Sequence, residues 1–489
     1  MNKNRVIILK VFLLIAIIVC SIPLAFAKLS LPAIFCNDMI LQRQQPILIW
    51  GKTDANQHVT ISFNHKVYTC VSDANGLWRG TLSSMQAGGP YQMIISNNYT
   101  NEKVTIDNIL IGEVWICAGQ SNMNFMLASD RDAKTELKEN NFNIREFRCA
   151  LPSGSMNPEN SENSKWVSAI GESAKKQFSA VAYYFAKNLQ LRLKVPVGII
   201  VMSCGATRAE TWTDPQILQT YPALQAFRNY WSSNINNKKE SLNNIPGKFY
   251  KDVVLPIAPF AAKGLIWYQG ESNTLPDNSG RSITERANEY KSLLKGLIQS
   301  YRIAWLNRNL PVYVIQLPNF IFPSGDIQWA KIRQAQLDVV DKTPHTGLIV
   351  TIDVGDSTNI HPNNKSPLGV RLANLALTNE YGIRFLYPVS SPVIKQFKIE
   401  GNKVILSFTD MGKASMFEKN LKGFEIADVV HPEKFIKASA VLINNQVIVT
   451  APEVKVPVIV RYAWADNPSV SLFNSEGLPA SPFTVNLIK

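Results

Sequence analysis

Apolar and polar positions divide the chain into three stretches with different periodicity. From about Leu29 to Asp107, short apolar runs alternate with turn sequences such as Asp73-Ala74-Asn75-Gly76. Short runs of this kind, separated by Gly, Asn, Asp and Pro, are typical of strands joined by tight turns. The pattern predicts an antiparallel β domain over residues 28–108, built as a small sandwich.

Between Ile109 and Tyr387, buried-strand patterns alternate with helical ones. The expected strands are residues 114–118, 197–203, 264–268, 312–317 and 348–353. Between them, apolar residues recur at helical spacing, as at Phe178, Val181, Phe185 and Leu189. Such alternation predicts a parallel sheet with helices on both faces. We therefore expect a central α/β domain over residues 109–387.

After Val389 the β pattern returns. Phe397–Leu406 and Val441–Val449 each carry apolar residues on both sides of a central Gly-Asn or Asn-Asn pair, which predicts two hairpins. The expected fold class is therefore α/β, with a parallel-sheet domain flanked by N-terminal and C-terminal β-sandwich-like regions. The C-terminal region is expected to cover residues 388–489.

The first 27 residues have the organisation of a secretory signal. Lys3 and Arg5 form a basic start, residues 11–20 an apolar core, and Ala25-Phe26-Ala27 a small-residue cleavage site. An uncleaved anchor is the alternative, but the core is shorter than the ~20 residues that a spanning helix needs. We expect an exported protein, periplasmic or secreted, without stable membrane insertion. The pattern does not indicate an oligomeric state.

Charge and cysteine content narrow the classes of partner. The formal net charge of +13 falls by three to +10 when the cations of residues 1–27 are removed, which favours anionic partners in general. The sequence shows no basic cluster interleaved with aromatic residues, so we expect no nucleic-acid partner. The cysteines form no Cys-x-x-Cys pair, and no disulfide pairing follows from the sequence. We expect neither a metal nor a cofactor.

Candidate chemistry begins at the end of the first central strand. Ser121 follows that strand within Gly119-Gln120-Ser121-Asn122-Met123. A strand that turns into a helix at this point presents a serine hydroxyl beside free N–H groups, which can bind an oxyanion. Met123 stands where an α/β-hydrolase elbow has its second glycine, so that elbow is disfavoured. A Gly-x-Ser triplet alone is more often an ordinary turn.

Polar residues at three other strand ends suit a serine-based site. Gly205 can bring a backbone N–H close to a substrate oxygen, and Gln269, Glu271 and Asn273 follow the next strand. His361 is the one histidine of five that follows a strand of the α/β region. Ligands of open α/β sheets bind at the carboxyl ends of the strands, and a serine nucleophile needs a base. His361 is therefore the candidate base.

Together, these motifs resemble the sialate O-acetylesterase family, which belongs to the wider SGNH-type hydrolases. The segments that carry the resemblance occur in the same order: Gly112-Glu113-Val114-Trp115, Gly119-Gln120-Ser121-Asn122-Met123, residues 267–273 and Ile360-His361-Pro362. It extends upstream to residues 41–43 and 73–78, and downstream to residues 462–468 and 476–480. The resemblance covers nearly the whole chain after residue 27.

The resemblance implies a serine esterase that removes acetyl groups from sugar hydroxyls. Ser121 would attack the acetyl carbonyl, with His361 as general base and then general acid. The N–H groups of Ser121 and Gly205 would hold the oxyanion, together with a side-chain amide. That amide belongs to Gln269 or Asn273, and the sequence does not rank them.

Two further residues are expected in supporting roles. Glu271 orients loops or substrate, or else bonds neighbouring backbone N–H groups as a structural carboxylate. Gln120 lies between the turn glycine and the nucleophile, where it can support the turn.

The histidine motif departs from the SGNH pattern at one position. Those enzymes generally have an aspartate three residues before the histidine, where this chain has Thr358. Asn359 stands two residues before and is neutral. We expect a main-chain carbonyl near Asn359 to accept the His361 Nδ1 proton and fix the tautomer. Asp356 or Asp353 is the alternative partner.

The implied substrate is an O-acetylated sugar or sialoglycan, and a sialate 9-O-acetylesterase is the first expectation. Acetylated xylan or another glycan is an alternative substrate. A glycan-binding protein with an inactive catalytic fold is a second class, which retention of both Ser121 and His361 disfavours. A lipase or peptidase is a third class, disfavoured because no apolar lid segment is evident.

Overall fold

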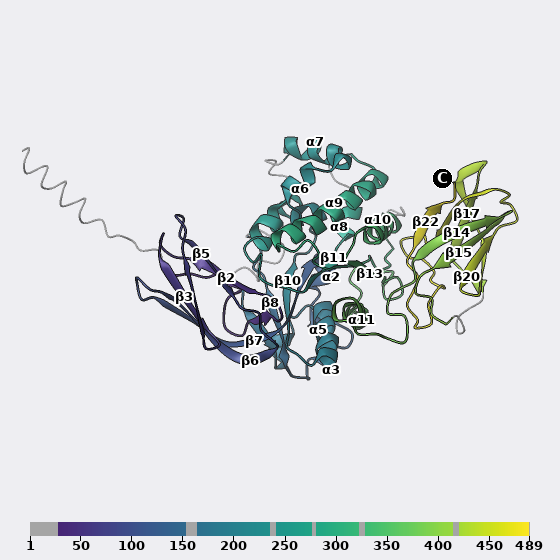
Figure 1. Ribbon diagram of the computed structural model, residues 1–489. Coiled ribbons are helices and arrows are strands. Elements are labelled where there is room, and N and C mark those ends of the chain that lie inside the picture. The colour runs from purple at the N-terminus through teal and green to yellow at the C-terminus, as the bar shows by residue number, and fades with distance from the viewer. Residues whose placement is uncertain are drawn as a thin grey trace, which may run out of the picture. The chain divides into compact units, whose positions relative to one another are not determined.

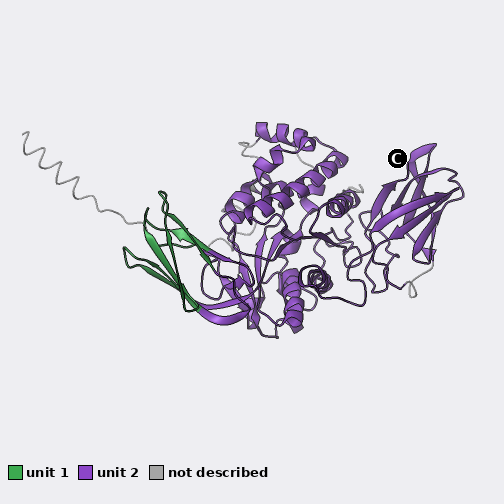
Figure 2. Cartoon of the chain, in the orientation of Figure 1, with its two compact units in different colours: residues 1–32, 49–82, 92–105 green, residues 33–48, 83–91, 106–489 purple. Residues whose placement is uncertain are grey.

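The computed structural model describes residues 28–152, 164–234, 241–275, 280–321, 328–413 and 420–488. The expected signal segment, residues 1–27, lies outside the described residues. The chain divides into two compact units, shown in different colours in Figure 2. Unit 1 comprises residues up to Pro32, Ile49–Leu82 and Gln92–Thr105, and unit 2 comprises Ala33–Leu48, Ser83–Tyr91 and residues from Ile106 onward. Within the described ranges, no helix combines the length and the apolarity needed to cross a membrane.

Unit 1 contains the β structure expected near the N-terminus. Strand β3 (His58–Phe63) pairs antiparallel with β4 (Lys66–Val71) and with β6 (Gly88–Asn97), while β2 (Ile47–Lys52) pairs with β5 (Leu77–Leu82). Alternate residues of β3 are buried, as the period of a half-covered strand requires.

Unit 2 is built on a mainly parallel sheet. Its central path runs β13-β12-β11-β7-β10-β8-β9, and only β9 is antiparallel to its neighbour. The strands are β7 (Lys103–Gly119), β8 (Asn141–Arg148), β9 (Trp166–Ala169), β10 (Val197–Ser203), β11 (Gly264–Tyr268), β12 (Val312–Ile315) and β13 (Thr346–Ile349); the short β1 (Ile40–Gln42) runs parallel to β7. Every residue of β10 and β11 is buried, as expected for parallel strands covered on both faces.

Helices cover both faces of this sheet, so the predicted α/β class is confirmed. Figure 1 shows α5 and α11 together on one face and α8, α9 and α10 on the other. The helices are α2 (Ser121–Asn124), α3 (Ala133–Glu136), α4 (Glu172–Lys175), α5 (Ala180–Leu193), α6 (Pro215–Gln219), α7 (Gln225–Asn234), α8 (Glu271–Thr274), α9 (Ile283–Ala304), α10 (Gln328–Lys342) and α11 (Ser366–Tyr381). Trp115 on β7 anchors the core beneath α5 and α11, with its ring 5.1 Å from Phe185 and 5.6 Å from Tyr313.

The last central strand is shorter than the sequence indicates. The apolar run predicts a strand over residues 348–353, whereas β13 spans Thr346–Ile349 and pairs with β12 over those four residues. Val350 and Ile352 are completely buried although they lie beyond the strand. Their hydrophobicity therefore reports burial of the following loop, not pairing in the sheet.

The C-terminal part of unit 2 forms two antiparallel sheets. Their orders are β14-β15-β20-β19-β16 and β18-β17-β21-β22. The strands are β14 (Ile394–Glu400), β15 (Lys403–Phe408), β16 (Asn420–Leu421), β17 (Phe424–Asp428), β18 (His431–Lys437), β19 (Ser439–Ile443), β20 (Gln446–Thr450), β21 (Pro457–Tyr462) and β22 (Phe483–Asn486). The pairs β14–β15 and β19–β20 are the two hairpins expected from the sequence.

A buried arginine joins this C-terminal part to the α/β sheet. Arg333 on α10 has no exposed surface, and burial lowers the pKa of its guanidinium to about 9. It donates to the carbonyls of Leu317 and Pro318 after β12, and to those of Ala465 and Asp466 after β21, at 2.7–2.8 Å. One cation therefore satisfies carbonyls from two segments that are distant in sequence.

Candidate active site

Three neighbouring strands end at the same level, and this places the nucleophile turn. In the parallel register, Gly119 at the end of β7 is opposite Ser203 of β10 and Tyr268 of β11. A Cβ on Gly119 would lie 2.1 Å from the Tyr268 carbonyl oxygen, and φ there is +150°. Only glycine allows this close approach. Ser121 therefore starts α2 at the carboxyl edge of the sheet, between the ends of two other strands.

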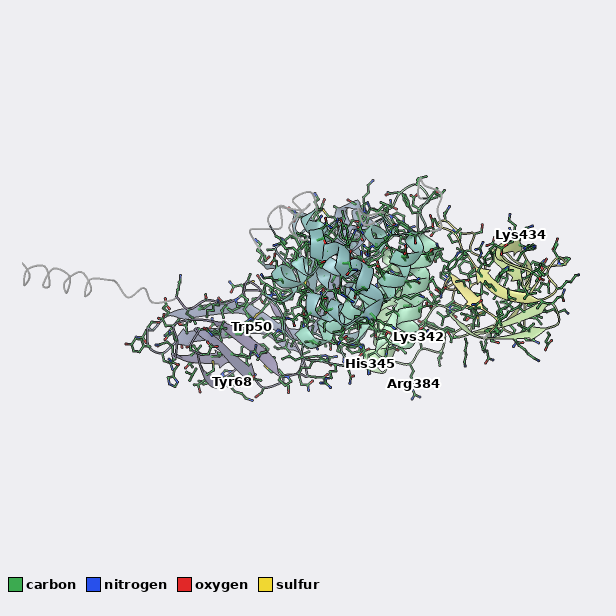
Figure 3. The ribbon with its side chains drawn as sticks, turned by 90° about the horizontal axis from the view of Figure 1, so that it is seen from above. Trp50, Tyr68, Lys342, His345, Arg384 and Lys434 are labelled. Atoms are coloured by element: carbon green, nitrogen blue, oxygen red, sulfur yellow. The ribbon has the colours of Figure 1, made fainter. Side chains whose placement is uncertain are left out.

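The structure brings Ser121 and His361 together. Nε2 of His361 lies 2.7 Å from Oγ of Ser121, and both residues are half-buried. The other histidines lie elsewhere: His58 in β3, His65 in the turn after it, and His431 in β18. His345, labelled in Figure 3, directly precedes β13 and so lies at the opposite end of that strand.

The Ser121 contact determines what His361 can do. To accept the hydroxyl proton, Nε2 must carry a lone pair, so the ring proton of the neutral imidazole resides on Nδ1. Burial lowers the pKa of His361, and the nearby charge of Lys365 lowers it further. Both effects favour the neutral ring, which is the form that acts as a base.

Short polar turns hold the His361 loop. Oδ1 of Asp356 accepts hydrogen bonds from the N–H and hydroxyl of Thr358 and from the N–H of Asn359, at 2.8, 2.8 and 3.2 Å. These bonds lower the pKa of Asp356. Oδ1 of Asn359 then accepts the His361 N–H at 2.9 Å. Asp356 and Asn359 therefore shape the backbone before the histidine.

The two alternative carboxylate partners are both bonded elsewhere. Asp356 bonds Thr358 and Asn359, and Asp353 forms an ion pair with Arg371 on α11. This arrangement is compatible with a main-chain acceptor for Nδ1 of His361. The identity of that acceptor stays a prediction.

Gly205 lies beside the Ser121 turn. The N–H of Cys204 donates to the carbonyl of Gly119 at 3.2 Å, which ties the end of β10 to the end of β7. Asn243 donates to the Gly205 carbonyl at 3.3 Å, and Gly205 is partly exposed. Its backbone is therefore close to the Ser121 turn, and its role as an oxyanion donor stays a prediction.

The two candidate amides differ in their hydrogen bonding. Nε2 of Gln269 donates to the Thr207 carbonyl at 3.1 Å and to Oδ1 of Asn273 at 2.7 Å, which uses both of its hydrogens. Nδ2 of Asn273 donates to Glu210 at 2.9 Å, which uses one of its two. Asn273 is therefore the better candidate for an oxyanion, and Gln269 orients it.

Gln120 and Glu271 connect the first and third motifs. Oε1 of Gln120 accepts the Ser272 N–H at 3.2 Å, at the start of α8. Glu271 is 2 % exposed, and its Oε1 accepts from Nδ2 of Asn122 at 2.6 Å. Burial raises the pKa of Glu271, and the Asn122 hydrogen bond and the charge of Lys365 oppose that shift. Oε1 of Glu271 is therefore bonded inside the protein, while its buried Oε2 has no hydrogen-bond partner among the described residues, and the role of Glu271 stays a prediction.

Two residues of this network were not singled out from the sequence. Asn122 is completely buried directly after the nucleophile, and its place in the motif was the available signal. Lys365 is also completely buried, and its Nζ donates to Oδ1 of Asn122 at 2.5 Å. Nothing local in the sequence distinguishes Lys365 from a surface lysine.

Cysteines and clusters of His, Asp and Glu are the other groups that carry metal or thiol chemistry. Across the described ranges, no group of three or more His, Cys, Asp or Glu side chains is arranged to hold a metal ion. The five cysteines of those ranges are free thiols, and burial raises the pKa of Cys117, two residues before the end of β7.

A serine hydroxyl in hydrogen-bond contact with a histidine, at the carboxyl edge of such a sheet, is the arrangement that serine hydrolases use. Residues 111–378, more than half of the chain, match the family model described as carbohydrate esterase, sialic acid-specific acetylesterase. The chain belongs to this family, and it is a carbohydrate acetylesterase.

Relatives and a solved structure agree with this assignment. The sialate O-acetylesterase of Homo sapiens is 26 % identical over 91 % of this chain and 90 % of its own length. That of Rattus norvegicus is 24 % identical over 92 % and 93 %. The crystal structure of a carbohydrate acetylesterase from Xanthomonas citri superimposes with a TM-score of 0.81 at 31 % identity, covering 94 % of this chain and all of that one. The predicted family and fold are confirmed.

Proposed function

We propose that this protein is an exported sialate O-acetylesterase that hydrolyses 9-O-acetyl esters with Ser121 as nucleophile and His361 as base. The observation that carries the proposal is the 2.7 Å contact between His361 Nε2 and Ser121 Oγ in a chain of this family. The net charge of +10 that remains after residues 1–27 are removed is compatible with an anionic sugar and does not by itself select one.

The reaction follows from the positions of the groups. His361 takes the hydroxyl proton as Ser121 Oγ attacks the acetyl carbonyl, and the carbonyl oxygen becomes an oxyanion. The N–H groups of Ser121 and Gly205, with the free hydrogen of the Asn273 amide, are the proposed donors to that oxyanion. His361 then gives its proton to the departing sugar oxygen, which leaves an acetyl ester on Ser121.

A water molecule completes the cycle. His361 removes a proton from water, which attacks the acetyl-serine and releases acetate and the free enzyme. The neutral state of His361, favoured by burial and by Lys365, is required at the start of both halves of the reaction. No metal is needed in this scheme.

Export is proposed from the first 27 residues. Lys3 and Arg5, the apolar core of residues 11–20 and Ala25-Phe26-Ala27 have the order of a cleaved signal. Expression of the full chain, with fractionation and N-terminal sequencing, tests this directly. A mature protein that starts at Lys28 outside the cytoplasm is expected, and a retained N-terminus contradicts cleavage.

The decisive test compares acetate release by wild type and Ser121→Ala from two substrates. These are 9-O-acetylated sialic acid and acetylated xylan oligosaccharides. We expect release from the sialic acid, reduced about 10⁴-fold or more in the variant because the nucleophile is lost. Preference for xylan would keep the mechanism and replace the substrate. Glycan retention without release from either substrate would instead indicate a binding protein.

A further inference from the structure

A lysine with no exposed surface contacts Asn122, the residue that follows Ser121. Lys365 precedes α11, four residues after His361. Its Nζ donates to Oδ1 of Asn122 at 2.5 Å and lies 5.0 and 5.3 Å from the ring centroids of Phe125 and Tyr268. Lysine is almost never fully buried unless it is paired, so its position here calls for a reason.

The Asn122 amide that Lys365 contacts joins both halves of the site. Nδ2 of Asn122 donates to Glu271 at 2.6 Å and to the carbonyl of Ile360 at 3.0 Å. Asn122 directly follows Ser121, and Ile360 directly precedes His361. One side chain therefore links the nucleophile turn to the histidine loop.

Lys365 is the donor that holds the oxygen end of this amide. An ammonium group only donates hydrogen bonds, so it requires the oxygen of Asn122 and excludes the flipped amide. The unflipped amide directs its two hydrogens at Glu271 and at the Ile360 carbonyl. The flipped orientation would also place the amide oxygen against the Glu271 carboxylate and the Ile360 carbonyl, so all three partners of Asn122 favour the same orientation.

We propose that Lys365 is a positioning residue of the hydrolytic site, holding the Asn122 amide in the one orientation that fixes Ser121 and His361 against each other. Its catalytic consequence rests on the proposed function. The link itself is a property of the folded chain and can be tested without turnover.

The charges around Lys365 give the link a measurable signature. Glu271 on α8, Asp130 before α3, His361 on the same loop and Tyr268 on β11 face it. Burial lowers the pKa of Lys365 to about 7, against the opposing effect of Glu271 and Asp130. The lysine is therefore charged in the range where His361 titrates, and its charge keeps the pKa of His361 low. Removing the charge should raise it.

The test is Lys365→Met, with Lys175→Met as the matched control. Lys175 is also completely buried, but its Nζ donates to the backbone carbonyls of Glu136 and Glu139, outside the site. The pKa of His361 is measured by NMR on histidine labelled with ¹³C at Cε1, assigned with His361→Gln. The kcat and KM for 4-nitrophenyl acetate are measured on the same proteins.

In Lys365→Met we expect an upward shift of the His361 pKa and a kcat reduced about 10²-fold, the scale of a misplaced reacting group, with KM little changed. Lys175→Met should change neither quantity. If Lys365→Met does not fold, the charge-balanced variant Glu271→Gln/Lys365→Met is used, because it leaves no uncompensated buried carboxylate. An unchanged His361 pKa in folded Lys365→Met, or an unchanged kcat in either folded variant, overturns the proposal. If wild type cleaves no acetate ester, the proposed function fails, and the NMR titration still decides for or against the Lys365 link.

Discussion

The nucleophile turn and the histidine loop reach the same site, but they are held in different ways. Around Ser121, the supporting side chains of Gln120, Asn122 and Glu271 are at most 3 % exposed, and they bond one another or distant segments. Before His361, Asp356 and Asn359 are exposed and bond only the next few residues. The nucleophile turn is thus supported by buried side chains, whereas local turns shape the exposed backbone directly before His361.

This difference predicts unequal tolerance to substitution. Removing one partner from a buried polar network leaves the other groups desolvated and unsatisfied, which costs far more than the hydrogen bond itself contributed. On an exposed loop, water replaces a lost partner. Activity should therefore be sensitive to substitution of the buried Asn122 and Glu271, whereas the exposed turn before His361 should tolerate substitution of Asp356 and Asn359.

The largest expected effect is a loss of folding stability in Asn122→Leu, measured against Asn359→Leu on the histidine side. Asn122→Leu removes the amide between buried Glu271 and Lys365, so we expect a loss of about 3–5 kcal/mol in unfolding free energy. Asn359→Leu removes one exposed hydrogen bond and should cost about 1 kcal/mol or less. Urea denaturation of both variants measures the difference. Equal losses would remove the distinction between the two halves.

The pH dependence of kcat/KM tests the environment of His361, the residue at which the two halves of the site meet. The folded-state pKa of His361 is lowered by burial and by Lys365, so the neutral base persists to lower pH than in a free histidine. The acid limb of kcat/KM should therefore lie below pH 6.5, the usual value. Because the unfolded chain binds this proton at higher pH, the same shift removes stability as pH falls below 6.5. An acid limb above that value would contradict the burial of the ring.

The smallest effects are expected from the carboxylates of the histidine loop. Asp356→Asn loses an acceptor in an exposed turn, and Asp353→Asn loses an ion pair with Arg371. Since neither carboxylate is bonded to His361, turnover should stay within about tenfold of wild type in each variant. A loss near ~10⁴-fold in either one, the scale for a triad aspartate, would identify the third triad member and refute a main-chain acceptor.

Much of this architecture follows from local patterns in the chain. Residues 197–203 and 264–268 were predicted as strands with the bounds they have, because continuous apolar runs of that length suit a doubly covered parallel sheet. The strand predicted over residues 348–353 extends too far at its C-terminal end, because Val350 and Ile352 are buried in a loop and not in the sheet. An apolar run in the sequence indicates that its residues are buried, but it does not show that they pair in a sheet.

The contact between Ser121 and His361 was predictable from the sequence, whereas the residues that support these two side chains were not. Strand ends of a parallel sheet meet at one edge, so Ser121 and His361 could be paired from topology alone. Lys365 could not, because its burial depends on Glu271, Asp130 and Asn122, which come from three separate segments. The choice between Gln269 and Asn273 likewise needs the positions of Thr207 and Glu210.

Arg333 has a consequence for how the protein can be engineered or recombined. Two of its four carbonyl acceptors belong to the loop after β21, at Ala465 and Asp466. A truncation at the boundary predicted near residue 388 would remove both of these acceptors and leave Arg333 of α10 with only the carbonyls of Leu317 and Pro318. The C-terminal sheets therefore cannot be replaced without changing the hydrogen bonds of Arg333. Any chimera or truncated variant of this enzyme that keeps α10 should also keep the loop that contains Ala465 and Asp466.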